Sequence, residues 1–110
     1  MKARIPGAMD KGSMMKRIQQ MQEDMERVQA EVEASNYTAS SGGGAVEAVV
    51  SGKHEVQSIT INPDVVDPED VEMLQDMIIV AINEAIRKAS EAMDKGIESA
   101  KGGLSIPGLF

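Results

Sequence analysis

Residues 67–103 read DPEDVEMLQDMIIVAINEAIRKASEAMDKGIESAKGG, and this stretch decides the fold. Its apolar residues recur at helical spacing, with bulky side chains up to Ile86 and mostly alanine after it. Asp67 can cap a helix and Gly102-Gly103 can end one, so we predict a single helix over residues 68–101. The thin alanine half would let another helix approach closely, so we expect this half to pair with a helix near the N-terminus.

The length of this helix carries an architectural prediction. A straight helix over residues 68–101 would be about 50 Å long at about 1.5 Å per residue. A compact chain of 110 residues has a radius of gyration of about 13 Å, so the helix must bend or project from the body. Projecting apolar faces need cover, and a second copy of the chain is the simplest cover. We therefore predict a symmetric homodimer.

A second helix is predicted near the N-terminus, with Ser13 as its N-cap. Its apolar residues alternate at spacings of four and three: Met14, Ile18, Met21, Met25, Val28 and Val32. This coiled-coil-like stripe must face another helix, in the same chain or in a partner. Residues 1–12 show no such periodicity and contain proline and glycine, so we expect a flexible arm there.

The segment between the helices is rich in β-branched residues. Partial alternation predicts strands at residues 45–51 and 55–61, and a third strand at Tyr37–Ser41. Together they would form a three-stranded antiparallel meander whose apolar face needs a covering layer. The predicted class is α+β, with one domain over residues 13–103 and a short apolar tail at residues 104–110.

The residue inventory offers little for catalysis. The chain has no Cys, no Trp and one His, His54, which falls in a predicted polar turn. The acids near the start of the last helix suit capping and do not match a calcium loop. Gly42-Gly43-Gly44 lacks the ending of a phosphate-binding loop. We predict no catalytic residue, no metal site, no cofactor and no small-molecule substrate, and therefore no enzyme.

No segment has the character of a signal peptide or of a membrane span. The longest apolar run, Met77–Ile82, is far shorter than the roughly 20 residues that cross a bilayer. The lack of Cys fits a reducing compartment. We expect the protein in the cytoplasm, without a membrane partner.

The net charge of −7 is unevenly distributed along the chain. Residues 1–17 carry five basic groups and one acid, residues 18–86 carry two basic groups and fourteen acids, and residues 87–110 carry four basic groups and three acids. Two basic ends therefore flank an acidic centre. From charge alone, the ends either bind DNA or only solubilise the chain and complement helix dipoles.

Several segments, taken in their order and spacing, carry a resemblance. They are MMKRIQQMQEDM at residues 14–25, GGAV at 43–46, SGKHEV at 51–56, ITINPD at 59–64, LQD at 74–76, AINEA at 81–85, and IPG at 106–108 in the tail. Over about residues 13–110 the chain resembles the YbaB/EbfC family of bacterial nucleoid-associated proteins. The resemblance implies an α–β–β–β–α subunit and a tweezer-like homodimer with long projecting N- and C-terminal helices. It also implies duplex DNA binding of low or modest sequence specificity, in the nucleoid, with roles in nucleoid organisation and gene regulation.

The resemblance attributes DNA contacts to the outer parts of the first and last helices. The matching positions are Lys16, Arg17, Arg87, Lys88, Lys95 and Lys101. Residues 1–12 lie outside the resemblance, and Lys2, Arg4 and Lys11 are predicted as additional DNA contacts from their charge alone. Acids among the basic residues of the last helix would weaken binding there. The alternative is a protein-interaction module that does not bind DNA directly.

Overall fold

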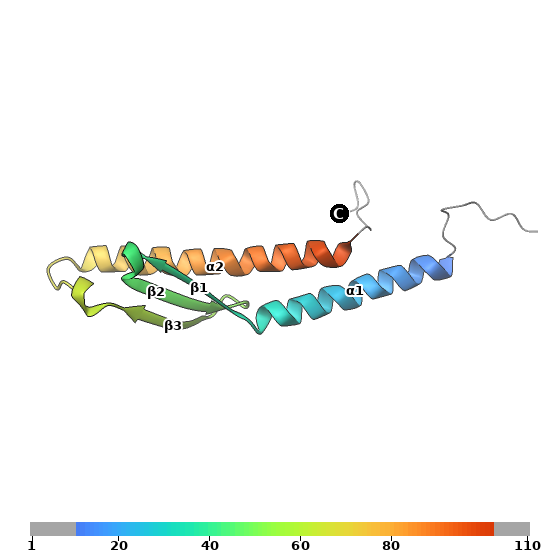
Figure 1. The fold of residues 1–110 in the computed structure, drawn as a ribbon, viewed down its shortest axis with the longest axis horizontal. Helices are drawn as coiled ribbons and strands as arrows, with labels where there is room; N and C mark the ends of the chain where they lie inside the picture. Colours follow the sequence, from blue (N-terminus) through green and yellow to red (C-terminus); the bar gives the residue numbers. More distant parts are fainter. Residues whose placement is uncertain (1–10, 103–110) are drawn as a thin grey trace, which may run out of the picture.

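The structure is a computed structural model that describes residues 11–102. The elements, in chain order, are α1 (Lys11–Glu33), β1 (Asn36–Ser41), β2 (Val46–Ser51), β3 (Val56–Ile61) and α2 (Val71–Lys101), with 3-10 turns at Gly42–Gly44 and Pro63–Val65. Helix α2 runs along one face of the sheet, and α1 extends beyond the sheet on the same side as the C-terminal half of α2 (Figure 1). The predicted α+β class and order of elements are confirmed.

The three strands form an antiparallel meander in the order β1-β2-β3. On β2, Val46, Ala48 and Val50 are fully buried, whereas the alternate residue Glu47 is exposed. On β1, Tyr37 pairs with Val50 and packs against the same buried cluster. The sheet therefore has one apolar face and one polar face, and the apolar face needs a cover, as the sequence predicted.

Helix α2 provides this cover. Ala81, Ala85 and Ala89 are fully buried and lie one turn apart, so they form a single line on the helix surface that packs into the core. The small methyl groups let the helix backbone lie close to the strands. Ser41 Oγ in β1 donates a hydrogen bond of 2.6 Å to the Met77 carbonyl and fixes the two layers together.

The alanine stripe was predicted to pair with the first helix, and this is only partly correct. Ala89 belongs to the sheet core, and the close helix pairing begins nearer the C-terminus of α2. There Gly96 faces Val28 of α1 without room for a Cβ between them. The absence of a side chain at residue 96 lets the two helices approach closely at this point.

The start of α2 lies three residues after the predicted start. Asp67 does not cap the helix; its Oδ1 accepts from the Glu69 N–H at 2.9 Å, and its carbonyl accepts from the Asp70 N–H at 3.0 Å. These two bonds close a separate turn. Asp70 is the N-cap, with its side chain accepting from the Met73 N–H at 3.3 Å. Both aspartates were suited to capping the helix, but Asp67 is used in the preceding turn, so Asp70 caps the helix.

The end of α2 and the start of α1 differ in how well they were predicted. Gly102 ends α2 with a φ of 53°, as expected. Helix α1 already includes Lys11 and Gly12, so Ser13 lies inside it and the predicted cap was wrong. A glycine in the first turn costs little helix stability, because few helical bonds depend on it. The predicted flexible arm and C-terminal tail otherwise lie outside the described residues.

The two helices are long relative to the sheet. Helix α2 has 31 residues and α1 has 23, which correspond to about 46 Å and about 35 Å. The first turns of α1 extend past the C-terminal end of α2 (Figure 1). This is the projecting arm that the helix lengths predicted.

Candidate nucleic-acid interface

The charge of α1 changes sign along its length. Residues 11–20 contain three cations, Lys11, Lys16 and Arg17, and no acid. Residues 21–33 contain five acids and one cation, Arg27. The positive charge of the helix is therefore concentrated in the turns that extend past α2. We call Lys11, Lys16 and Arg17 the cationic tip.

The side chains of the cationic tip are exposed. Within residues 11–102, none of the three makes a hydrogen bond or an ion pair. Long, unengaged cationic side chains can reorient toward an anion without first breaking a contact in the protein. The structure thus leaves the predicted residues Lys16 and Arg17, and the additional candidate Lys11, available for binding.

Arg87, predicted from the last helix, is engaged with two acids. Its Nε donates to Glu84 at 3.0 Å, and its other nitrogens contact Glu84 and Glu91 one turn away on each side. The hydrogen bond from Arg87 lowers the pKa of Glu84 and, reciprocally, Glu84 raises the pKa of Arg87. Two carboxylates around one guanidinium make this patch net negative, so Arg87 is poorly placed to attract a phosphate.

Lys88 reaches across to the sheet. Its Nζ donates to the Thr38 carbonyl of β1 at 2.9 Å. The ammonium therefore lies over the sheet body, away from the cationic tip. An incoming phosphate would compete with this hydrogen bond.

The remaining predicted residues lie on the C-terminal half of α2. Lys95 is exposed and follows Lys88 by seven residues, on the same side of the helix. Lys101 is the last helical residue and is partly buried. Three acids, Glu91, Asp94 and Glu98, are interspersed among these cations. This half of α2 is therefore close to neutral, and we still expect its acids to weaken DNA binding there.

Two predicted DNA-contact residues remain to be placed, and one exposed cation was not predicted. Lys2 and Arg4 lie outside the described residues. Lys53, in the turn between β2 and β3, is exposed and makes no ion pair within residues 11–102. It lies in the acidic centre of the sequence, where fourteen acids outweigh two basic groups, so the net charge of that segment does not point to it. The adjacent His54 has a φ of 66° and its Nε2 lies 3.2 Å from Ser90 Oγ, so it is a turn residue as expected.

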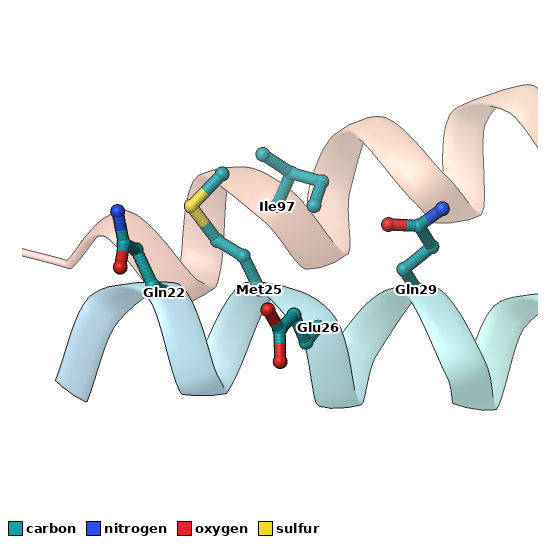
Figure 2. A pocket seen from close by; sticks show the side chains of 5 residues that line it. All are labelled: Gln22, Met25, Glu26, Gln29 and Ile97. Carbon is teal, nitrogen blue, oxygen red and sulfur yellow. The ribbon is translucent and has the colours of Figure 1, made fainter. Parts of the chain in front are cut away.

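A groove of about 380 Å³ lies between the two helices, lined by Gln22, Met25, Glu26, Gln29 and Ile97. Figure 2 shows Met25 of α1 extending toward α2 beside Ile97. The groove contains one carboxylate and no cation, so it does not suit a phosphate.

Residues 11–102 also lack the features of two other classes of site. In that part of the chain, no three His, Cys, Asp or Glu side chains gather as a metal ion would require. Neither described helix combines the length and the apolarity needed to cross a bilayer.

Comparison with known proteins gives a consistent result. Residues 7–104 match the model of the YbaB/EbfC DNA-binding family. A nucleoid-associated protein of Alkaliphilus metalliredigens is 56% identical over 104 residues, which cover 94% of this chain and 91% of the relative. One from Acetivibrio thermocellus is 54% identical, covering 89% of this chain and 88% of the relative. Among solved structures, the uncharacterized protein HP0035 from Helicobacter pylori has the same fold, with a TM-score of 0.68 and 21% identity, covering 86% of this chain and 100% of that one.

Proposed function

The chain belongs to the YbaB/EbfC DNA-binding family, and from that membership we propose that it binds duplex DNA in the bacterial nucleoid as a homodimer, without catalysis and with low or modest sequence specificity. The observation that carries the proposal is the cationic tip: three exposed, unengaged cations at the projecting end of an otherwise acidic chain. Residues 13–103 act as a single domain that carries Lys16 and Arg17 of this tip.

Binding would be driven by counterion release. Each phosphate that a cation neutralises contributes about −0.9 to the slope of log affinity against log salt concentration. Two tips in a dimer, with three cations each, offer roughly four to six such contacts. Affinity for duplex DNA should therefore fall steeply as salt rises.

Low specificity follows from the kind of side chain at the tip. Lys and Arg contacts to phosphate fix position on the duplex and carry no sequence information. Helix α1 contains no aromatic residue that could stack on a base or insert between base pairs. The acidic remainder of the chain repels a polyanion and would confine DNA to the tips.

The cations of α2 rank below the tip in this proposal. Lys95 and Lys101 contribute secondary contacts, and Arg87 and Lys88 contribute least because each is engaged within the fold. Lys2 and Arg4 precede α1 and would add charge at the same end of the chain.

The dimer is proposed from an apolar surface that the single chain leaves open. Between Met77 and Ile82, α2 is apolar on every side, which is more than a helix with one face on a sheet requires. Ile79 and Val80 are 54% and 55% exposed. The packing of α2 is concentrated on β1 and β2, so the edge strand β3 lies largely outside its footprint. A second copy would bury this surface and cover the open edge.

A homodimer gives the proposed roles a physical basis. Two tips held apart by a common body can engage two turns of one duplex or two separate duplexes. Sequence-independent contacts of this kind suit nucleoid organisation, and effects on gene regulation would follow from occupancy of promoter DNA.

The alternative is a protein-interaction module, favoured by the exposed apolar residues Met14, Met15 and Ile18 beside the cationic tip. Fluorescence anisotropy with a random duplex, titrated at several salt concentrations, separates the two. A steep salt slope supports DNA binding. No binding at low salt would contradict the proposal and favour the alternative.

A further inference from the structure

The apolar stripe of α1 continues beyond the helix that covers it. Val28 packs against Gly96, and Met25 lies beside Ile97 at the groove between the helices. Met14 and Ile18 continue the same stripe toward the N-terminus of α1. They are 47% and 40% exposed, because within residues 11–102 no helix accompanies α1 past Lys101.

The residues that follow α2 have a matching composition. Residues 103–110 read GLSIPGLF, with four large apolar side chains and no charged one. Helices α1 and α2 are antiparallel neighbours (Figure 1), so a chain leaving the C-terminus of α2 starts beside the uncovered end of the stripe.

The length of this segment is sufficient. Eight residues can span up to about 26 Å when extended. From Met21 to Met14, the stripe on α1 covers only about 10 Å. Gly102, with its φ of 53°, ends the helix and redirects the chain at this point.

We propose that residues 103–110 dock in cis onto the apolar stripe formed by Met14 and Ile18 of their own α1. The segment supplies the apolar layer that α2 would supply if it were longer. Lys16, two residues from Met14, lies about 200° around the helix and stays free of the docked segment. The proposal does not rest on DNA binding.

The protection of methionine side chains from oxidation tests this docking. Met14 is 47% exposed, so docking of residues 103–110 should slow its oxidation by hydrogen peroxide. In the unchanged chain we expect Met14 to oxidise several-fold more slowly than in the variant Ile106→Ser with Phe110→Ser, measured by peptide mass spectrometry. Met73, at the start of α2, is the internal reference, and its rate should be the same in both chains. Equal Met14 rates in the two chains would overturn the proposal.

Disulfide trapping distinguishes a segment from the same chain from one that belongs to another. Because the chain has no Cys, the pair Met14→Cys with Phe110→Cys introduces the only two thiols. We expect rapid oxidation to a cross-link of monomer mass, and no comparable cross-link in the control pair Met73→Cys with Phe110→Cys. A product of dimer mass would assign the stripe to a partner's segment, and a rate equal to the control would leave the stripe without this occupant. Either result would contradict docking in cis.

Discussion

Gly96 of α2 lies against Val28 of α1 so closely that no Cβ fits between them. The contact joins the two helices of the arm. The position of the cationic tip depends on this contact and on the neighbouring packing of Met25 beside Ile97, because α2 is the described element against which α1 packs most extensively.

Replacing Gly96→Ala should weaken the helix pair. Alanine raises intrinsic helix stability by about 1 kcal/mol, but the overlap with Val28 costs about 1–3 kcal/mol, so we expect a net loss in urea unfolding. Adding Val28→Ala to this variant makes room for the new methyl group and should restore part of the loss. If Gly96→Ala alone were more stable than the unchanged chain, the two helices would be able to move apart here without loss of folding stability.

The junction between α1 and the sheet should be less tolerant still. A Cβ on Gly52 would overlap the backbone carbonyl of Val32, and backbone cannot rotate away as a side chain can. We expect Gly52→Ala to destabilise the fold by more than about 2 kcal/mol, measured by thermal unfolding. Gly43→Ala is the matched control, because its φ of 68° imposes strain but no atom lies within 4 Å of the new methyl group. Similar losses in both variants would show that the overlap with Val32 costs no more than an alanine at positive φ does.

DNA affinity should depend on the cationic tip. We expect Lys16→Glu with Arg17→Glu to reduce affinity for random duplex DNA at least tenfold and to flatten the salt slope, while circular dichroism stays unchanged. Arg27→Glu with Lys53→Glu changes the net charge equally in the acidic part of the chain, and should reduce affinity much less. Equal losses would mean that only total charge matters.

Within α2 the engaged arginine should matter less than the free lysine. Arg87→Gln removes a cation already held by Glu84 and Glu91, whereas Lys95→Gln removes one that makes no ion pair within residues 11–102. We expect the larger loss of DNA affinity, in the same anisotropy assay, from Lys95→Gln. The reverse order would indicate that phosphate displaces the two glutamates.

The pH dependence of the Glu84 contact has a definite sign. Its pKa in the folded chain is lowered, chiefly by the hydrogen bond from Arg87, so the contact stabilises the fold above the ordinary glutamate pKa and is lost as pH falls through the lowered value. An NMR titration of the Glu84 carboxyl should give a higher pKa in Arg87→Gln than in the unchanged chain. Lys95→Gln serves as the control, because Lys95 is not among the groups that lower the pKa of Glu84, and the Glu84 pKa should be unchanged in that variant.

The order of elements could be predicted because the apolar residues of each segment recur at one dominant spacing. Apolar spacings of four and three identified α1, and alternation identified β2, where Val46, Ala48 and Val50 are buried. The start of α2 was missed because Asp67 and Asp70 both suit an N-cap, and only the local turn decides between them. The spacing of residues along the chain does not show which of the two aspartates caps the helix.

The candidate interface was less predictable than the fold. Sequence alone treats every cation at the basic ends as equivalent, but contacts across the fold divide them. Lys88 bonds to Thr38, fifty residues earlier in the chain, and such a pairing cannot be read from spacing along one helix. Arg87 is a partial exception, because Glu84 and Glu91 stand one turn away on each side and could have been recognised.

Tyr37 packs against the buried cluster of the sheet, and it is the only tyrosine in a chain without tryptophan. Intrinsic fluorescence therefore reports on β1 and its surroundings and does not respond to the end of α1. Far-ultraviolet circular dichroism, in contrast, weights both helices. If the arm frays before the body unfolds, ellipticity will fall on heating while the emission stays constant, and the interval between the two transitions will measure how independently the arm melts.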